Sequence, residues 1–205
     1  MAFKEVKLED LNLDVYKTFA EDWLALTAGD KNGYSSMTVS WGQMGSLWKG
    51  EGLKAFAGMP VATVYVRPQR YTKKFIDEQP FFTLSAFNGE RKSELGFLGS
   101  KSGRDYDDKL RACGLTPLYL ENAVAIEEAE TIFVCKKLFT YKMEKSGFFY
   151  PETAGKNYPN EDFHQGYIGE IVKILRKIYS ASDSKTPTET QVRRFLTLSI
   201  NLKTP

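Results

Sequence analysis

Residues 61–72 read VATVYVRPQRYT, and they join the strongest strand signal of the chain to a cluster of cations and hydroxyls. The first six of these residues form a nearly continuous apolar run with several β-branched members, which predicts a buried strand. Pro68 marks the end of that strand, because proline cannot donate to a β-ladder. Residues 72–79 predict a short helix with Thr72 as its N-cap. Cations and hydroxyls therefore meet where a strand passes to a helix, and helix N-termini favour anions.

Other elements are expected on both sides of this stretch. Strands are predicted at 37–41, 81–87 and 131–141, and helices at 14–27, 91–98 and 105–113. Residues 42–60 and 147–164 predict loops, because they are rich in glycine or in proline, asparagine and aromatic residues. In residues 81–87, Phe82, Leu84 and Ala86 share one face of the strand. Residues 168–179 are ambiguous, and the spacing of their apolar residues favours a helix.

Composition excludes several classes of chemistry. The 205 residues are 42% hydrophobic and 26% charged, which is typical of a folded globular protein. The chain has one His and two Cys, so it lacks the four ligands of a structural zinc site. Its net charge of +2 is too small to predict a nucleic-acid partner. No stretch approaches the roughly 20 apolar residues of a membrane span, and the start of the chain lacks an apolar signal core. We therefore expect a cytoplasmic protein that binds neither membranes nor nucleic acids.

The domain organisation is expected to be simple. Residues 1–180 are predicted to form one domain that begins with a helical segment at 1–29. Residues 181–205 begin with a stretch rich in Ser and Thr, and they predict a C-terminal arm or tail.

A second cationic cluster, GSKSGR at residues 99–104, joins two predicted helices. Its backbone amides, two hydroxyls and two cations could bind a phosphate monoester near a helix N-terminus. The alternative is a solvated Gly/Ser turn, and for residues 67–72 the alternative is a turn whose arginines form surface ion pairs. Two such clusters in one chain favour the phosphate interpretation. Residues 38–42 add small polar side chains that could meet the heteroatoms of a flat ring, and residues 85–87 repeat that pattern. The alternative is a strand that simply exposes its hydroxyl face to solvent.

Four motifs, taken in order, resemble those of the flavin reductase-like, FMN-binding split-barrel family, which includes flavoredoxin. They are MTVSWG at 37–42, VYVRPQRYT at 64–72, LGSKSGRD at 98–105 and HQGYIGE at 164–170. The resemblance spans roughly residues 30–178. It implies a mainly β fold with flanking helices, an antiparallel split barrel of the Greek-key type. It also implies a homodimer with FMN near the subunit interface, and a barrel strand at 167–177 where the apolar spacing favours a helix.

The same resemblance assigns cofactor-binding residues. It places Thr38, Val39, Ser40 and Trp41 against the isoalloxazine ring, and Ser85, Ala86 and Phe87 along the ring or the ribityl chain. Around the phosphate it places Arg67, Arg70, Tyr71, Thr72, Gly99, Ser100, Lys101 and Ser102.

His164 is the candidate catalytic residue. A lone histidine is commonly a hydrogen-bonded structural residue, and that alternative stays open here. The resembling family places a histidine near the flavin or nicotinamide site. As a hydrogen-bond donor, His164 could stabilise reduced flavin or orient nicotinamide.

The resemblance predicts an FMN-binding oxidoreductase of the flavin reductase type that takes electrons from NAD(P)H. One alternative is a flavoredoxin-like carrier that holds FMN tightly and exchanges electrons with a protein partner. Another is a flavin-binding module without turnover. In each case the flavin supplies the redox chemistry, which is consistent with the scarcity of His and Cys.

Overall fold

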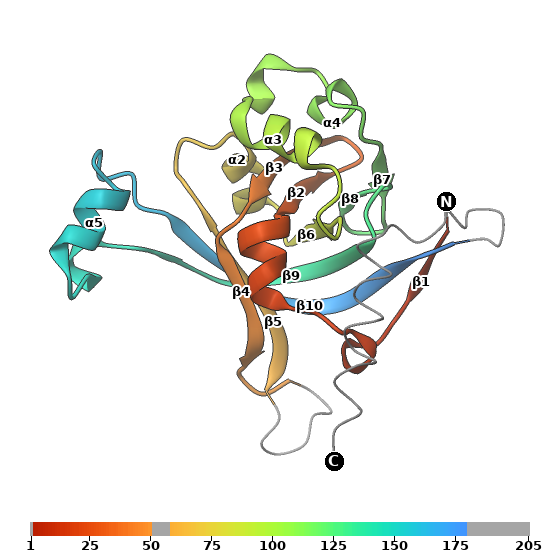
Figure 1. The fold of residues 1–205 in the computed structure, drawn as a ribbon, viewed down its shortest axis with the longest axis horizontal. Coiled ribbons are helices and arrows are strands. Elements are labelled where there is room, and N and C mark those ends of the chain that lie inside the picture. Colours follow the sequence, from red (N-terminus) through yellow and green to blue (C-terminus); the bar gives the residue numbers. More distant parts are fainter. Residues whose placement is uncertain (1, 51–57, 180–205) are drawn as a thin grey trace, which may run out of the picture.

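The computed structural model describes residues 2–50 and 58–179 (Figure 1). Its main element is an eight-stranded antiparallel sheet in the order β3-β2-β6-β9-β10-β5-β4, with β1 paired to β10. Consecutive strands β5 and β6 are separated in the sheet by β10 and β9, as in a Greek-key arrangement. The structure therefore confirms a mainly β, antiparallel fold with flanking helices.

The strands have the following bounds: β1 Ala2–Glu5, β2 Leu24–Asp30, β3 Gly33–Val39, β4 Gly42–Leu47, β5 Met59–Val66, β6 Phe81–Ala86, β7 Pro117–Tyr119, β8 Val124–Ile126, β9 Thr131–Lys142 and β10 Gln165–Ile178. The α-helices are α1 Val15–Lys17, α2 Thr72–Glu78, α3 Lys92–Ser100, α4 Lys109–Ala112 and α5 Pro151–Asn157. A π turn covers Thr18–Asp22, and short 3-10 turns cover Leu8–Asp10, Gly103–Asp105 and Lys145–Gly147. No helix within the described ranges is long and apolar enough to cross a membrane.

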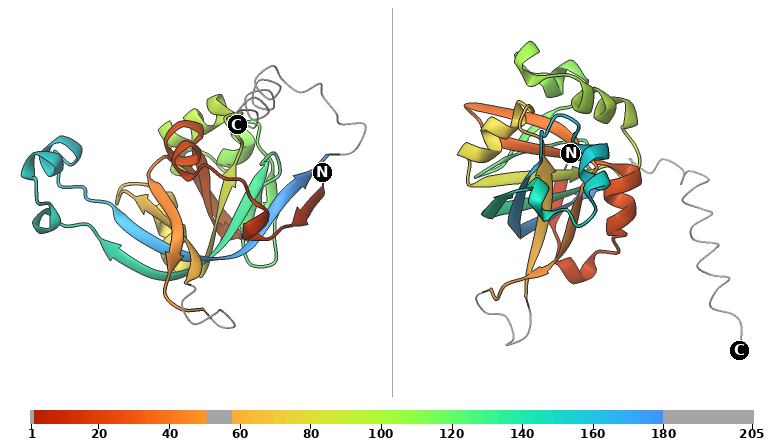
Figure 2. Two further views of the ribbon diagram at one scale, coloured as in Figure 1. Left: turned by 60° about the horizontal axis from the view of Figure 1, so that its bottom comes forward. Right: turned by 90° about the vertical axis from the view of Figure 1, so that its left-hand side faces the viewer.

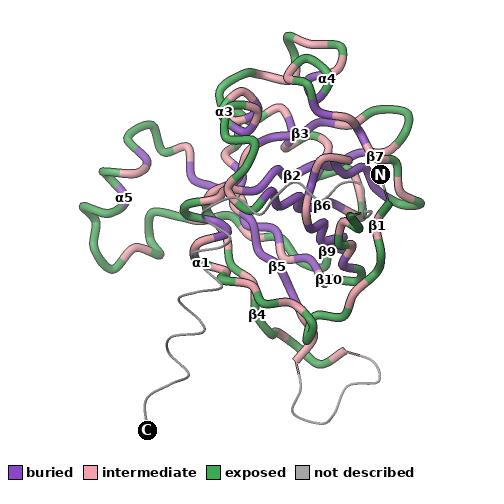
Figure 3. The backbone as a smooth tube through the Cα atoms, turned by 45° about the vertical axis from the view of Figure 1, so that its right-hand side comes forward, coloured by how far each residue is buried: buried purple, intermediate pink, exposed green. Residues whose placement is uncertain are grey.

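The sheet is buried on both faces at its centre (Figure 3). Phe82, Leu84 and Ala86 of β6 pack in one apolar cluster with β2, β5 and β10, as the alternation in this strand predicts. Phe87 packs in a second cluster, which lies under α3, α4 and the β7–β8 hairpin. The layer of α3 and α4 covers one side of the barrel (Figure 1). This second layer explains why the other face of β6 is also buried.

The β9–β10 hairpin extends away from the barrel and ends in α5 (Figures 1 and 2). We call residues 143–164, which connect the two strands, the arm. The arm has an apolar cluster of its own, built from Ala154, Tyr158 and Phe163 with Met143 and Phe148 beside them. Because α5 occupies 151–157, the predicted loop at 147–164 is wrong in that part.

The predicted helix at 14–27 is wrong beyond residue 22. Helical turns cover residues 15–22, and then Trp23 adopts a positive φ of 63° and the chain continues as β2. Strand β2 pairs with β3 on one side and with β6 on the other. Its side chains divide between the two apolar clusters, so pairing with distant strands overrides the local helical spacing.

The predicted loop at 42–60 is also wrong, because residues 42–47 form β4 and pair with β5. Gly42 is required there: a Cβ at this position would lie 2.3 Å from the ring of Phe19. Residues 51–57 lie outside the described residues. The helix predicted at 105–113 shortens to α4 at 109–112, and Gly114 follows it with a φ of +80°, as expected of a glycine after a helix. Thr72 is the first residue of α2 and not its N-cap, which is Tyr71.

For β10 the resemblance is confirmed and the apolar spacing is wrong. Strand β10 pairs with β5, β9 and β1, and its register against β9 shifts twice, at Ile168/Gly169 and at Ile171/Lys173. The first shift leaves Leu138 of β9 without a partner, and the second leaves Val172 of β10 without one. The extra residue at Val172 moves the side-chain alternation of β10 by one position, so its apolar pattern departs from a period of two. Gly169 lies at the first shift, where a Cβ would come within 2.7 Å of Phe82 and 2.9 Å of Cys135. The predicted tail at 181–205 lies outside the described residues.

Candidate anion and ring-binding site

The two cationic clusters predicted from the sequence meet in one cavity of about 120 Å³, which we call the anion cavity. One wall comes from the start of α2 and the other from the turn that follows α3. Its lining residues are Met37, Gln69, Arg70, Tyr71, Thr72, Leu98, Ser100, Lys101, Ser102, Gly103 and Lys109. Six of the predicted phosphate residues are thus neighbours in space: Arg70, Tyr71, Thr72, Ser100, Lys101 and Ser102.

Three cations line the anion cavity, and none of them forms an ion pair with any residue in ranges 2–50 and 58–179. Arg70 donates from Nη1 to the backbone oxygen of Gly99 at 2.7 Å. Lys101 is exposed and lies at the end of α3. Lys109 is buried and donates to two backbone oxygens, those of Ser36 at 3.1 Å and Leu98 at 2.7 Å. Three unneutralised cations around one small cavity match an anionic ligand.

Lys109 was not identified from the sequence. Only 7% of the residue is exposed, and burial together with the nearby charge of Arg70 lowers its pKa to about 8. An ammonium has three N–H donors, and two of them are used by the carbonyl groups, so one is left for a ligand. The sequence contains a weak indication that Lys109 is buried, because it lies one turn before Cys113 on the same side of the helix predicted at 105–113. That position would place its ammonium against the protein.

The hydroxyls of the anion cavity are held by local hydrogen bonds. Thr72 Oγ1 is 2.9 Å from Ser35 Oγ, and Ser100 Oγ donates to the backbone oxygen of Gly96 at 2.8 Å. Ser102 Oγ accepts from the backbone N–H of Arg104 at 3.2 Å, so its own proton remains available to donate. Cations and at least one hydroxyl donor therefore fit a phosphate group.

Arg67 lies outside the anion cavity, although it is in the same motif as Arg70. Its guanidinium pairs with Asp162, donates to the backbone oxygen of Asn157 at 2.9 Å, and lies 5.2 Å from the ring centroid of Tyr158. Hydrogen bonds from Arg67 and Gln69 lower the pKa of Asp162. In this structure Arg67 therefore fixes the arm to the barrel.

The predicted ring-binding residues divide into exposed and buried groups. Thr38 donates to the backbone oxygen of Leu95, and Trp41 is 45% exposed. Val39, Ser85, Ala86 and Phe87 are buried in the protein, so their side chains do not line the anion cavity. The hydroxyl of Ser85 is buried without a hydrogen-bond partner among the described residues. Ser40 is half-buried, and the backbone of Gly99 lies beside Thr38.

His164 lies at the base of the arm, against Trp41. The ring centroids of the two residues are 5.0 Å apart with an interplanar angle of 39°. On its other side, His164 Nδ1 is 2.9 Å from the hydroxyl of Tyr158, and both residues are buried. Burial and the charge of Arg67 lower the pKa of His164 to about 4, so the imidazole is neutral near pH 7. With Nδ1 held by Tyr158, Nε2 is the nitrogen left for a ligand.

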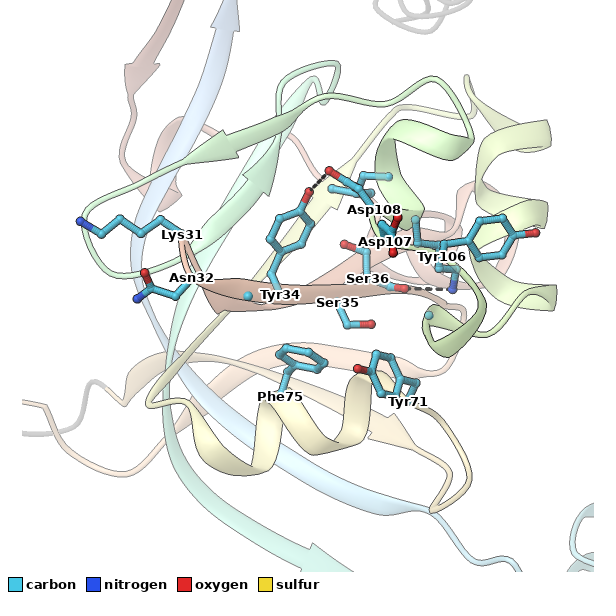
Figure 4. A pocket seen from close by; sticks show the side chains of 14 residues that line it. Lys31, Asn32, Tyr34, Ser35, Ser36, Tyr71, Phe75, Tyr106, Asp107 and Asp108 are labelled. Carbon is cyan, nitrogen blue, oxygen red and sulfur yellow. Dashed lines mark hydrogen bonds between the residues drawn. The ribbon is translucent and has the colours of Figure 1, made fainter.

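A larger cavity of about 340 Å³ lies next to the anion cavity (Figure 4). We call it the hairpin cavity, because its lining begins at the turn between β2 and β3. Its residues are Lys31, Asn32, Gly33, Tyr34, Ser35, Ser36, Tyr71, Phe75, Gly103, Tyr106, Asp107, Asp108, Lys109 and Leu110. The described residues hold no cluster of three or more side chains suited to a metal ion.

Comparison with known proteins gives no matching family model and no matching curated protein. Solved structures do match. An FMN-binding domain of a flavin reductases-like enzyme from Shewanella baltica OS155 is 15% identical with a TM-score of 0.57, over 85% of this chain and 77% of that one. Flavoredoxin from Methanosarcina acetivorans is 19% identical with a TM-score of 0.53, over 92% and 84% of the two chains.

A third structure names the architecture. It is a protein from Shewanella frigidimarina NCIMB 400 assigned as a flavin reductase with a split barrel domain. It is 17% identical with a TM-score of 0.54, over 87% of this chain and 79% of that one. At these identities the likeness establishes the fold. The chain is a split barrel of the kind seen in flavin reductase-like proteins and flavoredoxin.

Proposed function

We propose that this protein is an FMN-binding oxidoreductase of the flavin reductase type. The proposal rests on three cations, Arg70, Lys101 and Lys109, which line one cavity. None of the three forms an ion pair with an acidic residue among the described residues. Met37 of β3 lines this cavity. The chain continues from the end of β3 to Trp41, whose ring lies against His164. A cationic cavity at one end and a half-exposed tryptophan beside a histidine at the other would suit the phosphate and the ring of FMN.

Some residues of the chain would bind the phosphate of FMN, and others would orient its ring. Arg70, Lys101, Lys109 and Ser102 would hold the phosphate with charge-assisted hydrogen bonds. Trp41 and the polar residues Thr38 and Ser40 would lie along the ring. His164 would present Nε2 to it as a neutral donor or acceptor, fixed in orientation by Tyr158. FMN, when bound, would supply the reversible redox chemistry of the site.

We further propose NAD(P)H as the electron donor, on the strength of the resemblance in the four motifs. An electron carrier of the flavoredoxin type and a flavin-binding module without turnover are the alternatives. We also infer a cytoplasmic location, which the two unpaired cysteines, Cys113 and Cys135, support.

We propose that the protein works as a homodimer with the flavin near the subunit interface. The support is an aromatic patch on the outer face of the sheet, formed by Trp48, Phe139, Tyr141 and Tyr65. Trp48 and Phe139 contact each other edge to face, and each is about half exposed, at 48% and 49%. Clustered exposed aromatic residues are typical of protein–protein interfaces.

The first prediction concerns flavin binding and reduction. The full chain titrated with FMN should show the visible absorption of bound oxidised flavin. Under anaerobic conditions NADH or NADPH should bleach that absorption. If FMN binds but both nucleotides reduce it slowly, the carrier or the passive module replaces the reductase. If the protein is colourless and does not bind added FMN, the proposed function is wrong.

The second prediction tests the phosphate site. Lys101→Ala removes a cation from the anion cavity, and a charge-assisted hydrogen bond contributes about 1.5 to 3 kcal/mol. We therefore expect FMN affinity to fall about 10- to 100-fold in calorimetric titration, with riboflavin affinity nearly unchanged, because riboflavin has no phosphate. Lys74→Ala, at an exposed position on α2, is the matched control and should change neither. Equal losses for the two flavins would place Lys101 elsewhere.

The third prediction tests His164. If its Nε2 contacts the flavin or the nicotinamide, His164→Ala should slow the reduction of bound FMN by about 100-fold or more. Tyr158→Phe keeps the imidazole but removes its hydrogen bond, so it should cause a smaller loss. Stopped-flow measurement at saturating NADH gives both rates. A wild-type rate in His164→Ala would show that this histidine is structural.

The fourth prediction tests the dimer. Phe139→Lys places a charge in the aromatic patch and should shift the molar mass in solution, measured by light scattering, from dimer to monomer. Tyr16→Lys, at a position of α1 that is 76% exposed, is the control and should leave the dimer intact. A wild-type chain that is monomeric at micromolar concentration would refute the proposal directly.

A further inference from the structure

The side-chain nitrogen of Lys109 is buried between two elements of the fold and borders a cavity. Only 7% of the residue is exposed. Nζ donates to the backbone oxygens of Ser36 in β3 and Leu98 in α3, at 3.1 and 2.7 Å. Lys109 also lines both the anion cavity and the hairpin cavity. Because two of its N–H groups are held by the protein, the third position on Nζ is the one left for a ligand.

The carboxylates nearest to this nitrogen in the chain and in α3 are bound to other groups. Asp108 accepts a hydrogen bond from the hydroxyl of Tyr34 at 2.7 Å, which Figure 4 shows, and it pairs with Arg111 at 3.1 Å. Glu94 of α3 pairs with Arg91. Burial raises the pKa of Tyr34, so this phenol stays neutral and supplies no negative charge. An anion that enters the anion cavity would therefore be the first negative charge to pair with the ammonium.

The other charged groups around Lys109 favour the loss of its proton. Burial lowers its pKa to about 8, and the positive charge of Arg70 contributes to that shift. Lys101 adds a further cation to the same cavity, whereas Asp107 is exposed and lines only the hairpin cavity. The thiol of Cys113, at the end of α4, keeps its proton because burial raises its pKa. The remaining charged residue that lines either cavity is Lys31.

Loss of this proton changes what Nζ offers to a ligand but leaves its contacts with the protein possible. An ammonium has three N–H donors, whereas a neutral amine has two donors and one lone pair. The two donors that remain suffice for the carbonyl groups of Ser36 and Leu98. The lone pair then replaces the third donor, and it repels phosphate oxygens because they are acceptors. The protonation of one atom thus decides whether this position attracts or repels a phosphate.

We propose that the anion cavity binds a phosphate monoester tightly only while Lys109 is an ammonium, so that at alkaline pH the bound phosphate takes up one proton at Nζ. This inference rests on the proposed flavin function and deepens it, because it makes FMN binding dependent on pH. The proton comes from the solvent, and no bond of the phosphate forms or breaks. Because such coupling is reciprocal, a bound phosphate raises the pKa of Lys109.

The test measures the affinity of the full chain for FMN by isothermal titration calorimetry, from about pH 7 to about pH 9. The second pKa of a phosphate monoester is about 6, so the ligand is a dianion throughout this range. The protonated fraction of Lys109 falls about tenfold over the range, and FMN affinity should fall by the same factor. Riboflavin shares the ring of FMN but has no phosphate, so its affinity should change less than about twofold.

Proton uptake is a second measurement, and it needs no variant. Titrations at about pH 8 in buffers of different ionisation enthalpy should show about half a proton taken up for each FMN bound, and none for riboflavin. Nitrogen NMR of the lysine-labelled chain follows Nζ directly. Without FMN the titration midpoint of Lys109 should lie at its pKa of about 8. Saturating FMN should raise that midpoint to about 9 or above.

Two variants assign the effect to one residue. Lys109→Met removes the ammonium and keeps an unbranched side chain, so its FMN affinity should be low and independent of pH over this range. Cys113→Ser is the matched control, because Cys113 is the other titratable group of this segment that acts on the charge of Lys109. It should keep both the wild-type affinity for FMN and its dependence on pH.

The outcomes separate this inference from the proposed function. If FMN binds equally well across the pH range, or binds without proton uptake, the inference is overturned and the flavin function stands. The same holds if riboflavin affinity falls in parallel, or if Lys109→Met keeps the wild-type pH dependence. If Lys109→Met does not fold, the proton uptake and the NMR midpoint of the wild type decide. If neither flavin binds at any pH, both proposals are wrong.

Discussion

The ammonium group of Lys109 connects three elements that the candidate site depends on. From the start of α4 it donates to the backbone oxygen of Ser36 in β3 and to that of Leu98 in α3. Strand β3 is the last strand of the sheet at its end, so its outward carbonyl groups have no strand partner. Burial of an unpaired charge costs several kcal/mol, and the lowered pKa of Lys109, about 8, reflects that cost. A bound phosphate would offset it by supplying the missing negative charge.

The split barrel forms a packed scaffold, and the cations of the anion cavity come from segments outside its strands. Central strands such as β6 are packed on both faces and carry no candidate contact in the anion cavity. The cations come from the start of α2, the end of α3 and the start of α4. These segments converge because α2 and α3 both pack against β3. Binding groups on the ends of short helices, fixed by a β scaffold, are a common arrangement for a ligand site.

The two cationic motifs of the candidate site can be predicted from the sequence, whereas the packing between distant segments cannot. RPQRYT and GSKSGR each place several donors within six residues, so their role could be proposed before their convergence was known. Lys109 is alone in a short helix, and only the folded chain shows that its ammonium lies between two carbonyl groups. Ser85 and Phe87 were assigned to the flavin by resemblance, but the second apolar layer buries their side chains. The period of two in β10 is interrupted by the extra residue at Val172, so the apolar spacing of this strand resembles that of a helix.

The motif at 67–72 links the two ends of the candidate site through two arginines three residues apart. Arg70 faces the anion cavity, whereas Arg67 binds Asp162 and lies against Tyr158 in the arm. Tyr158 in turn holds Nδ1 of His164, which lies beside Trp41. A single strand-to-helix turn therefore sets both the position of Arg70 in the anion cavity and, through Tyr158, the orientation of the imidazole. Burial lowers the pKa of His164, and the positive charge of Arg67 lowers it further, so this turn contributes to keeping the imidazole neutral.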